Sequence, residues 1–169
     1  IPKDAVLVDC KGKYIYPSFI DLYTDYGIST KSINSENSGN FNRTTQIESN
    51  TKGAYGWNEA IKSQQQAHTM YSKNESKAKT MRSLGFGATL SHLKDGIARG
   101  TGVFVSLADN SDNYSILKDK ASAHYSFSKG SSSQSYPSSI MGVISLLRQT
   151  YYDAKWYESK PKEEGINLS

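Results

Sequence analysis

YPSFIDLYTDYG, residues 16–27, decides how this chain folds. Pro17 fixes its own φ angle and biases the residue before it toward extended backbone. A short apolar run centred on Ile20 follows, and Gly27 ends it. This pattern predicts a buried strand that runs directly into a functional loop.

Two shorter segments precede this strand. Residues 5–9 are mostly apolar, residues 10–13 (CKGK) are turn formers, and residues 14–16 begin the next extended segment. An apolar run, a turn and a second extended run predict a β-hairpin over residues 1–16.

A long polar segment follows the strand. Residues 29–52 are rich in Ser, Asn, Thr and Lys, and such a composition buries too little apolar surface to offset the entropy of ordering. We expect an insertion on the surface, and two interpretations stay open: a lid over a functional face, or a solvated loop.

The middle of the chain predicts two helices and two further strands. Helix-like spacing runs from Trp57 to Tyr71, and a second helix ends at Gly85. Residues 88–90 and 103–107 read as short buried strands.

A glycine-rich loop, residues 91–102 (SHLKDGIARGTG), lies between these strands. It lacks the Gly-Lys-Ser/Thr ending of a phosphate loop. It is either a tight structural loop or a loop that contacts a ligand through His92, Asp95 and Arg99, its candidate ligand-binding side chains.

The clearest helical pattern comes near the end of the chain. Ile140, Val143, Ile144 and Leu147 form an apolar stripe that predicts a helix over residues 140–154. A Ser-rich loop, residues 128–136, precedes it, and a polar tail, residues 158–169, follows it.

Several of these blocks resemble the metal-dependent amidohydrolase superfamily, in particular imidazolonepropionase-like amidohydrolases. That family carries Pro-Gly-(aromatic or aliphatic)-Ile-Asp-x-His-x-His at its first barrel strand, and its two histidines bind the catalytic metal. Aligned on Pro17, Ile20 and Asp21, this chain has Tyr23 and Asp25 in place of those histidines. Further similar blocks are residues 85–90, 91–102, 123–127 and 140–157.

The resemblance implies an α/β fold, the N-terminal portion of an amidohydrolase-type (β/α) TIM barrel. Residues 1–16 would come from the flanking β-sandwich, and residues 17–157 would form a partial barrel with the insertion at 29–52. A complete barrel takes about 250 residues, so we expect this barrel to be incomplete in 169 residues. Its natural partner would then be the remainder of its own polypeptide or a second amidohydrolase domain.

For function, the resemblance implies hydrolysis of non-peptide or small peptide-like C–N bonds by the full-length protein, with zinc or another divalent metal as its cofactor. Tyr23 is a poor metal ligand at neutral pH. We therefore expect this segment to hold no metal and to be inactive alone. The alternative is a catalytically inactive amidohydrolase-like module with a structural or binding role.

Composition excludes some other classes. The net charge of +4 comes from 20 basic and 16 acidic residues that are scattered along the chain, which argues against nucleic-acid binding. No apolar run approaches the ~20 residues that span a bilayer. Cys10 has no second cysteine in this sequence to pair with. Twelve tyrosines suit an extracytoplasmic (periplasmic) setting, but the same side chains also pack well at domain interfaces, so both interpretations stay open.

Overall fold

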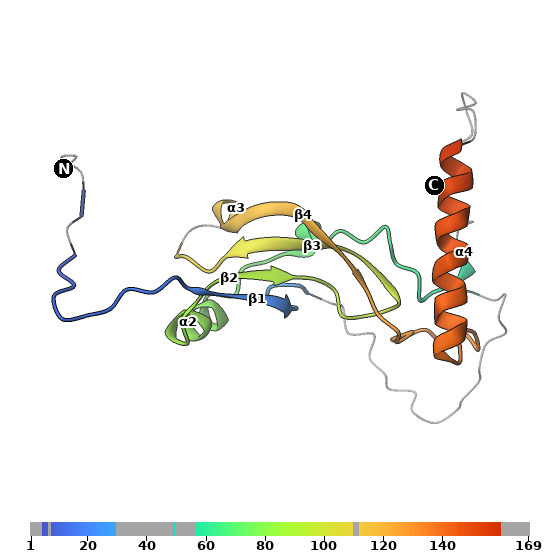
Figure 1. The fold of residues 1–169 in the computed structure, drawn as a ribbon, viewed down its shortest axis with the longest axis horizontal. Coiled ribbons are helices and arrows are strands. Elements are labelled where there is room, and N and C mark those ends of the chain that lie inside the picture. Colours follow the sequence, from blue (N-terminus) through green and yellow to red (C-terminus); the bar gives the residue numbers. More distant parts are fainter. Residues whose placement is uncertain (1–4, 7, 30–48, 50–56, 110–111, 160–169) are drawn as a thin grey trace.

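The computed structural model describes residues 5–6, 8–29, 49, 57–109 and 112–159 (Figure 1). It is a mixed α/β structure, as expected for part of an amidohydrolase-like fold. The elements, in chain order, are β1 (Phe19–Thr24), α1 (Ala67–Met70), α2 (Glu75–Ser83), β2 (Phe86–Ser91), β3 (Ala98–Ser106), α3 (Asp112–Ser115), β4 (Ile116–Tyr125) and α4 (Ile140–Ser159).

The four strands form one sheet in the order β1-β2-β3-β4. β1 and β2 are parallel, whereas β3 is antiparallel to both of its neighbours. The ends of β1, β2 and β4 therefore lie at the same edge as the start of β3. Figure 1 shows this end of β1 and β2 facing the side of the molecule that carries α4. Side chains distant in sequence meet there.

The main core lies where α2 covers the sheet. Asn74 caps this helix by accepting a hydrogen bond from the Lys77 N–H, and Gly85 (φ 92°) ends it. The second predicted helix and the strand at residues 88–90 are thus confirmed. The buried side chains of this core are Tyr26, Ile28, Ala67, Ala78, Leu93, Val103, Val105 and Leu107.

The predicted C-terminal helix is also confirmed, as α4. The Ser139 hydroxyl accepts the Gly142 N–H at its start. Val143 and Leu146 are its buried residues, and they pack in a second small core with Ala60 and Ile97. The predicted stripe is only partly right, because its members Ile140 and Ile144 are exposed.

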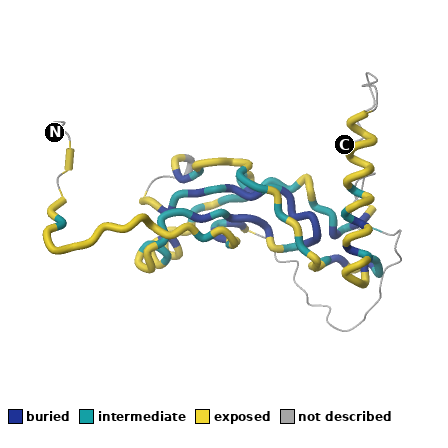
Figure 2. The backbone as a smooth tube through the Cα atoms, viewed as in Figure 1, coloured by how far each residue is buried: buried dark blue, intermediate teal, exposed yellow. Residues whose placement is uncertain are grey.

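The prediction that the first strand is buried is wrong. β1 forms, but most of its length is exposed (Figure 2). Phe19 is 67% exposed and Leu22 65% exposed. Among the residues that the structure describes, β1 is the edge strand of the sheet and pairs with β2 alone. The apolar residues of β1 are suited to burial, but burial also requires another element to pack on them, and a local sequence pattern does not specify that element.

Two other predictions need correction. The turn at residues 10–13 forms, with the Lys13 N–H donating to the Cys10 carbonyl at 3.0 Å, but the described residues on either side form no strand. Of the helix predicted from Trp57 to Tyr71, only α1 is helical. The insertion at 29–52 lies outside the described residues, apart from its first residue and Ser49.

The missing helical turns have a physical cause, since this segment pairs with β3 instead. Ile61 bridges to Ala98, and Gln66 bridges to Thr101. Gly100 (φ 78°) permits this approach, because a Cβ at that position would lie 2.0 Å from the Gln65 carbonyl oxygen. β3 consequently begins inside the predicted glycine-rich loop.

Candidate functional site

The candidate site lies at the sheet end where β1, β2 and β4 finish. Three aromatic rings, which we call the ring cluster, come together there: Tyr23, His92 and His124. The Tyr23 and His92 rings meet edge to face with centroids 4.8 Å apart. His92 and His124 stack at 3.7 Å with an interplanar angle of 12°. The backbone fixes this arrangement in part, because the His92 N–H donates to the Thr24 carbonyl at 2.9 Å.

His92 is fully buried at the centre of the ring cluster. Its Nδ1 lies 2.7 Å from the Leu93 carbonyl oxygen. A carbonyl only accepts, so Nδ1 carries the proton and Nε2 presents a lone pair. Within the described part of the chain, that Nε2 has no hydrogen-bond partner. Burial lowers the pKa of His92, and the nearby charges of Arg99 and Lys94 lower it further.

His124 covers one face of His92. Its Nε2 is hydrogen bonded to the Ser122 hydroxyl at 2.7 Å. Gly102 on the neighbouring strand leaves room for this pair, because a Cβ there would lie 2.6 Å from the Ser122 oxygen and 2.7 Å from His124 Nε2. Burial, followed by the proximity of His92 and Arg99, lowers the pKa of His124 to about 4. Both rings are therefore neutral at pH 7.

Arg99 brings a positive charge to the ring cluster. The residue is only 6% exposed, with Nε donating to the Gly96 carbonyl and Nη1 donating to the Tyr23 hydroxyl, each at 3.1 Å. No Asp or Glu of the described ranges forms an ion pair with it. Buried charges are normally paired, so this guanidinium stands out.

Asp25 and Lys94 form an exposed pair beside the ring cluster. Lys94 Nζ donates to Asp25 Oδ1 at 3.3 Å and lies 5.3 Å from the centroid of the Tyr23 ring. Partial burial raises the pKa of Asp25, but a backbone hydrogen bond and Lys94 outweigh it, so the pKa is lowered overall. The two charges balance one another.

The donors at this site do not fit the divalent metal that the fold family implies. Tyr23 and Asp25, the two positions of the family's histidine pair, each contact a protein cation, Arg99 and Lys94 respectively. His92 and His124 stack face to face, so their in-plane lone pairs do not converge as metal ligands must.

Asp95, the third candidate of the glycine-rich loop, has a different role. Its carboxylate pairs with the Lys62 ammonium and accepts the Ser131 N–H at 2.7 Å and the Ser131 hydroxyl at 2.6 Å. Burial raises its pKa, but these contacts outweigh that effect and lower it. Asp95 thus joins two loops, and the structure brings only His92 and Arg99 of the three candidates into the site.

Sequence reasoning missed Lys94, Ser122 and His124. His124 stood in a block that resembles the amidohydrolase family, which was the available signal, but its contact with His92 depends on the antiparallel pairing of β3 and β4. No local pattern specifies that pairing.

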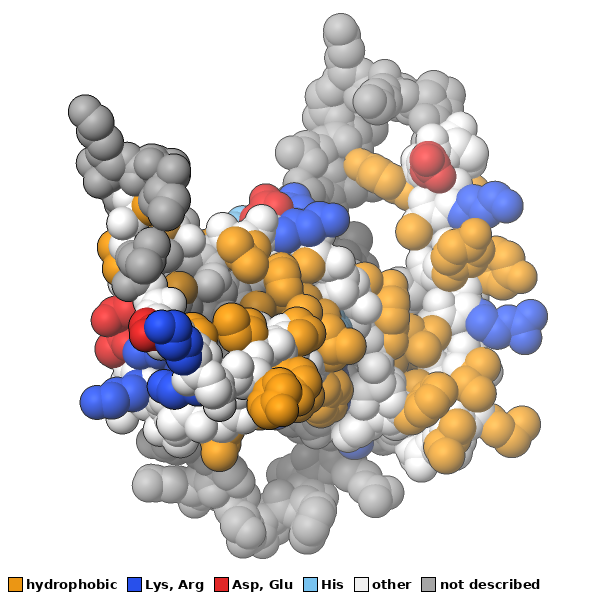
Figure 3. All heavy atoms as spheres, turned by 60° about the vertical axis from the view of Figure 1, so that its left-hand side comes forward, with side chains coloured by type: hydrophobic (Ala, Val, Ile, Leu, Met, Phe, Trp, Pro, Cys, Tyr) orange, Lys and Arg blue, Asp and Glu red, His pale blue; other side chains and the backbone are white. Residues whose placement is uncertain are grey.

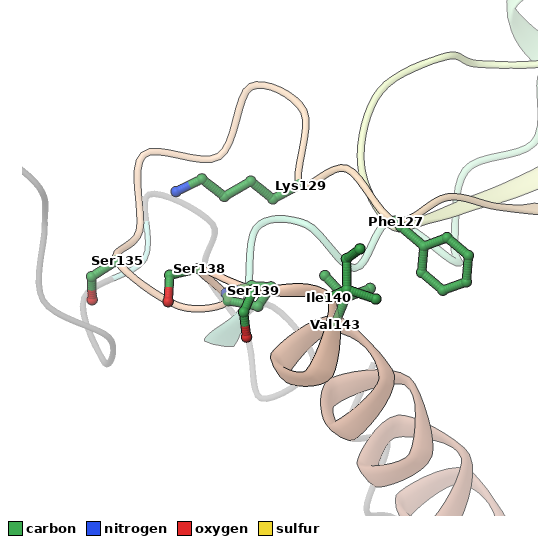
Figure 4. Close-up of a pocket in the computed structure, with 8 residues that line it drawn as sticks. Phe127, Lys129, Ser135, Ser138, Ser139, Ile140 and Val143 are labelled. Carbon is green, nitrogen blue, oxygen red and sulfur yellow. The ribbon is translucent and has the colours of Figure 1, made fainter.

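A pocket of about 430 Å³ lies at the start of α4, away from these residues (Figure 4). Phe127 after β4, Lys129 and Ser135 of the loop, and Ile140 and Val143 of the helix line it. The Lys129 ammonium donates to the Gln134 carbonyl at 2.6 Å within the same loop. The pocket shares no residue with the ring cluster.

Comparison with known proteins gives a likeness of fold. No family model matches the chain, and a search of curated proteins finds no relative. The chain is similar to the crystal structure of an amidohydrolase from Thermotoga maritima MSB8, with 20% identity and a TM-score of 0.60 over 100% of this chain and 43% of that one. It thus spans less than half the length of that protein. Among the helices that the structure describes, none has the length and apolar character to cross a bilayer. The likeness to the Thermotoga structure shows that the fold is amidohydrolase-like.

Proposed function

We propose that this chain is the N-terminal part of an amidohydrolase-like hydrolase that acts on C–N bonds, and that its own first-strand site does not hold the catalytic metal. The likeness of fold to the Thermotoga amidohydrolase and the separated sequence blocks support the first half of the proposal. The remaining catalytic groups would come from the rest of the polypeptide or from a second amidohydrolase domain.

One observation carries the second half: the buried Arg99 guanidinium donates to the Tyr23 hydroxyl. Two unit charges about 4 Å apart interact by about 4 kcal/mol near a protein surface, and a divalent ion doubles that to about 8 kcal/mol. A metal ion at this position would be repelled by Arg99 to that extent. The carboxylate beside it that could offset the repulsion is Asp25, which is already paired with Lys94. The site is thus unfavourable for a cation.

A catalytically inactive module with a structural or binding role is the second candidate. It is favoured by the apolar surface that the chain exposes, visible in Figure 3 as orange side chains gathered over the face turned to the viewer and along α4. The exposed large side chains on β1 and α4 are Phe19, Ile20, Leu22, Tyr23, Ile140, Met141, Ile144, Tyr151, Tyr152, Trp156 and Tyr157. Such surface suits contact with further protein.

Hydrolysis of a panel of small N-acyl amino acids by the longest natural form of the protein separates these candidates. The variant Asp25→Asn removes the carboxylate among the two possible ligands with little change of shape. Activity that survives Asp25→Asn within about twofold supports a hydrolase whose metal lies elsewhere. Loss of activity in Asp25→Asn would contradict a metal-free site, and absence of activity in the parent protein would favour the inactive module.

A further inference from the structure

Two groups of the site lack the partners that their chemistry calls for. The Arg99 guanidinium has five N–H donors, of which two N–H groups are used within the described residues. His92 Nε2 is a buried acceptor that receives no hydrogen bond from that same part of the chain. Unsatisfied buried polar groups are rare in folded proteins and call for an explanation.

The charges of the site specify the charge of its ligand. Asp25 and Lys94 balance one another, and both histidines are neutral at pH 7. Arg99 therefore leaves one positive charge without a counter-charge among the described residues, which a monovalent anion would balance. A phosphate dianion would bring two negative charges and so leave the site with an excess negative charge. A planar guanidinium also matches the two oxygens of a carboxylate.

Tyr23 provides the rim of the site. Its hydroxyl oxygen accepts from Arg99, and no hydrogen bond among the described residues uses its O–H proton, which can therefore donate to an anion held by that guanidinium. The residue is 61% exposed, so the anion can approach from this side. The inward neighbour of the Tyr23 ring is His92.

We propose that this site binds a small organic acid, with its carboxylate on Arg99 and Tyr23 and a neighbouring O–H or N–H donating to His92 Nε2. α-Hydroxy acids and N-acylated amino acids carry both groups. The inference rests on the proposed absence of a metal at this site, since a bound cation would occupy the same space as the acid.

Calorimetric titration of the protein with lactate, propionate and inorganic phosphate at pH 8.5, where phosphate is predominantly the dianion, tests this proposal. Lactate and propionate have equal charge and similar size, and lactate alone has the α-hydroxyl. We expect lactate to bind about fivefold more tightly than propionate, as one net hydrogen bond provides, and phosphate to bind more weakly than either acid.

Three variants and one control assign the binding to named groups. Arg99→Met should weaken both acids at least about tenfold, as expected for a charge-assisted hydrogen bond. His92→Phe should equalise lactate and propionate. Arg148→Met makes the same substitution at an exposed residue of α4 and should change nothing. Arg99→Lys, which retains the charge without the fork, gives an intermediate affinity if the protein is folded, as a two-dimensional NMR spectrum verifies.

Three results would overturn the proposal: phosphate that binds as tightly as lactate, acid binding that survives Arg99→Met, or no binding of either acid by the parent protein. A parallel zinc titration separates this failure from that of the proposed function. Stoichiometric zinc binding that blocks the acids would refute the metal-free site itself. If the protein binds neither zinc nor the acids, only the present inference is refuted.

Discussion

Replacing Arg99 by Met tests whether the buried guanidinium serves binding rather than stability. The substitution removes two hydrogen bonds, to the Gly96 carbonyl and the Tyr23 hydroxyl. Because the donor is a charged guanidinium, each bond is worth about 1.5–3 kcal/mol, so their loss costs about 3–6 kcal/mol. It also removes a buried charge without a counter-charge in the described chain, whose desolvation costs several kcal/mol. Met retains much of the aliphatic volume, so we expect a free energy of unfolding within about 1 kcal/mol of the parent, or higher.

Asp95→Ala is the matched comparison, since Asp95 lies shortly before β3 and its contacts within the described residues join two loops. It removes one ion pair and two hydrogen bonds, and because the group is partly exposed we expect a loss of about 1–3 kcal/mol. Urea unfolding in buffer without organic acids, followed by circular dichroism at concentrations where the chain is monomeric, measures both. An Arg99→Met variant that loses more stability than Asp95→Ala would refute the assignment of Arg99 to binding.

Three further predictions follow from the described geometry. Gly100→Ala should lower the free energy of unfolding by at least about 3 kcal/mol, because its φ is 78° and the new Cβ would lie 2.0 Å from the Gln65 carbonyl oxygen. The control Gly12→Ala, with a φ of 74° but open space around it, should cost about 1 kcal/mol. Equal costs for the two variants would contradict the packing argument. The pKa of His124 falls from about 6.5 unfolded to about 4 folded, so its neutral ring stabilises the fold fully above pH 6.5 and loses that contribution as the pH falls from 6.5 to about 4. For a partly buried ring this amounts to about 1–2 kcal/mol, and a His124→Gln variant with an unchanged pH dependence of urea unfolding would refute it. The exposed apolar faces of β1 and α4 should bind a hydrophobic dye and promote self-association, which Met141→Lys should reduce, whereas a strictly monomeric protein without dye binding would count against these faces as contact surfaces.

Local sequence signals predicted β1, α2, β2, α4 and part of β3, but not β4 and not what covers each element. Pro17 and the apolar run after it identify β1, and Ser139 with the stripe at Val143 identifies α4, because caps and periodicity act within a few residues. The exposure of Phe19 depends on elements far from it in sequence. The residue spacing after Trp57 favours a helix, but this segment bridges to β3 instead, which is a tertiary effect.

The site was predictable only in part for the same reason. The resemblance pointed to Tyr23 and Asp25, and the glycine-rich loop pointed to His92 and Arg99. The strand order brings the last two beside Tyr23 and adds His124 from β4. Which charges balance one another depends on these distances, so the sequence could not predict that Arg99 lacks a counter-charge among the described residues.

Zinc binding by the 169-residue chain shows whether Tyr23 and Asp25 form a metal site. The chain is dialysed against excess zinc and then against metal-free buffer, and its zinc content is measured by elemental analysis beside Tyr23→Phe and Asp25→Asn. Because Arg99 and Lys94 already contact these two positions, we expect well under one zinc per chain, with no difference among the three proteins. One zinc per chain in the parent, lost on Asp25→Asn, would contradict this expectation.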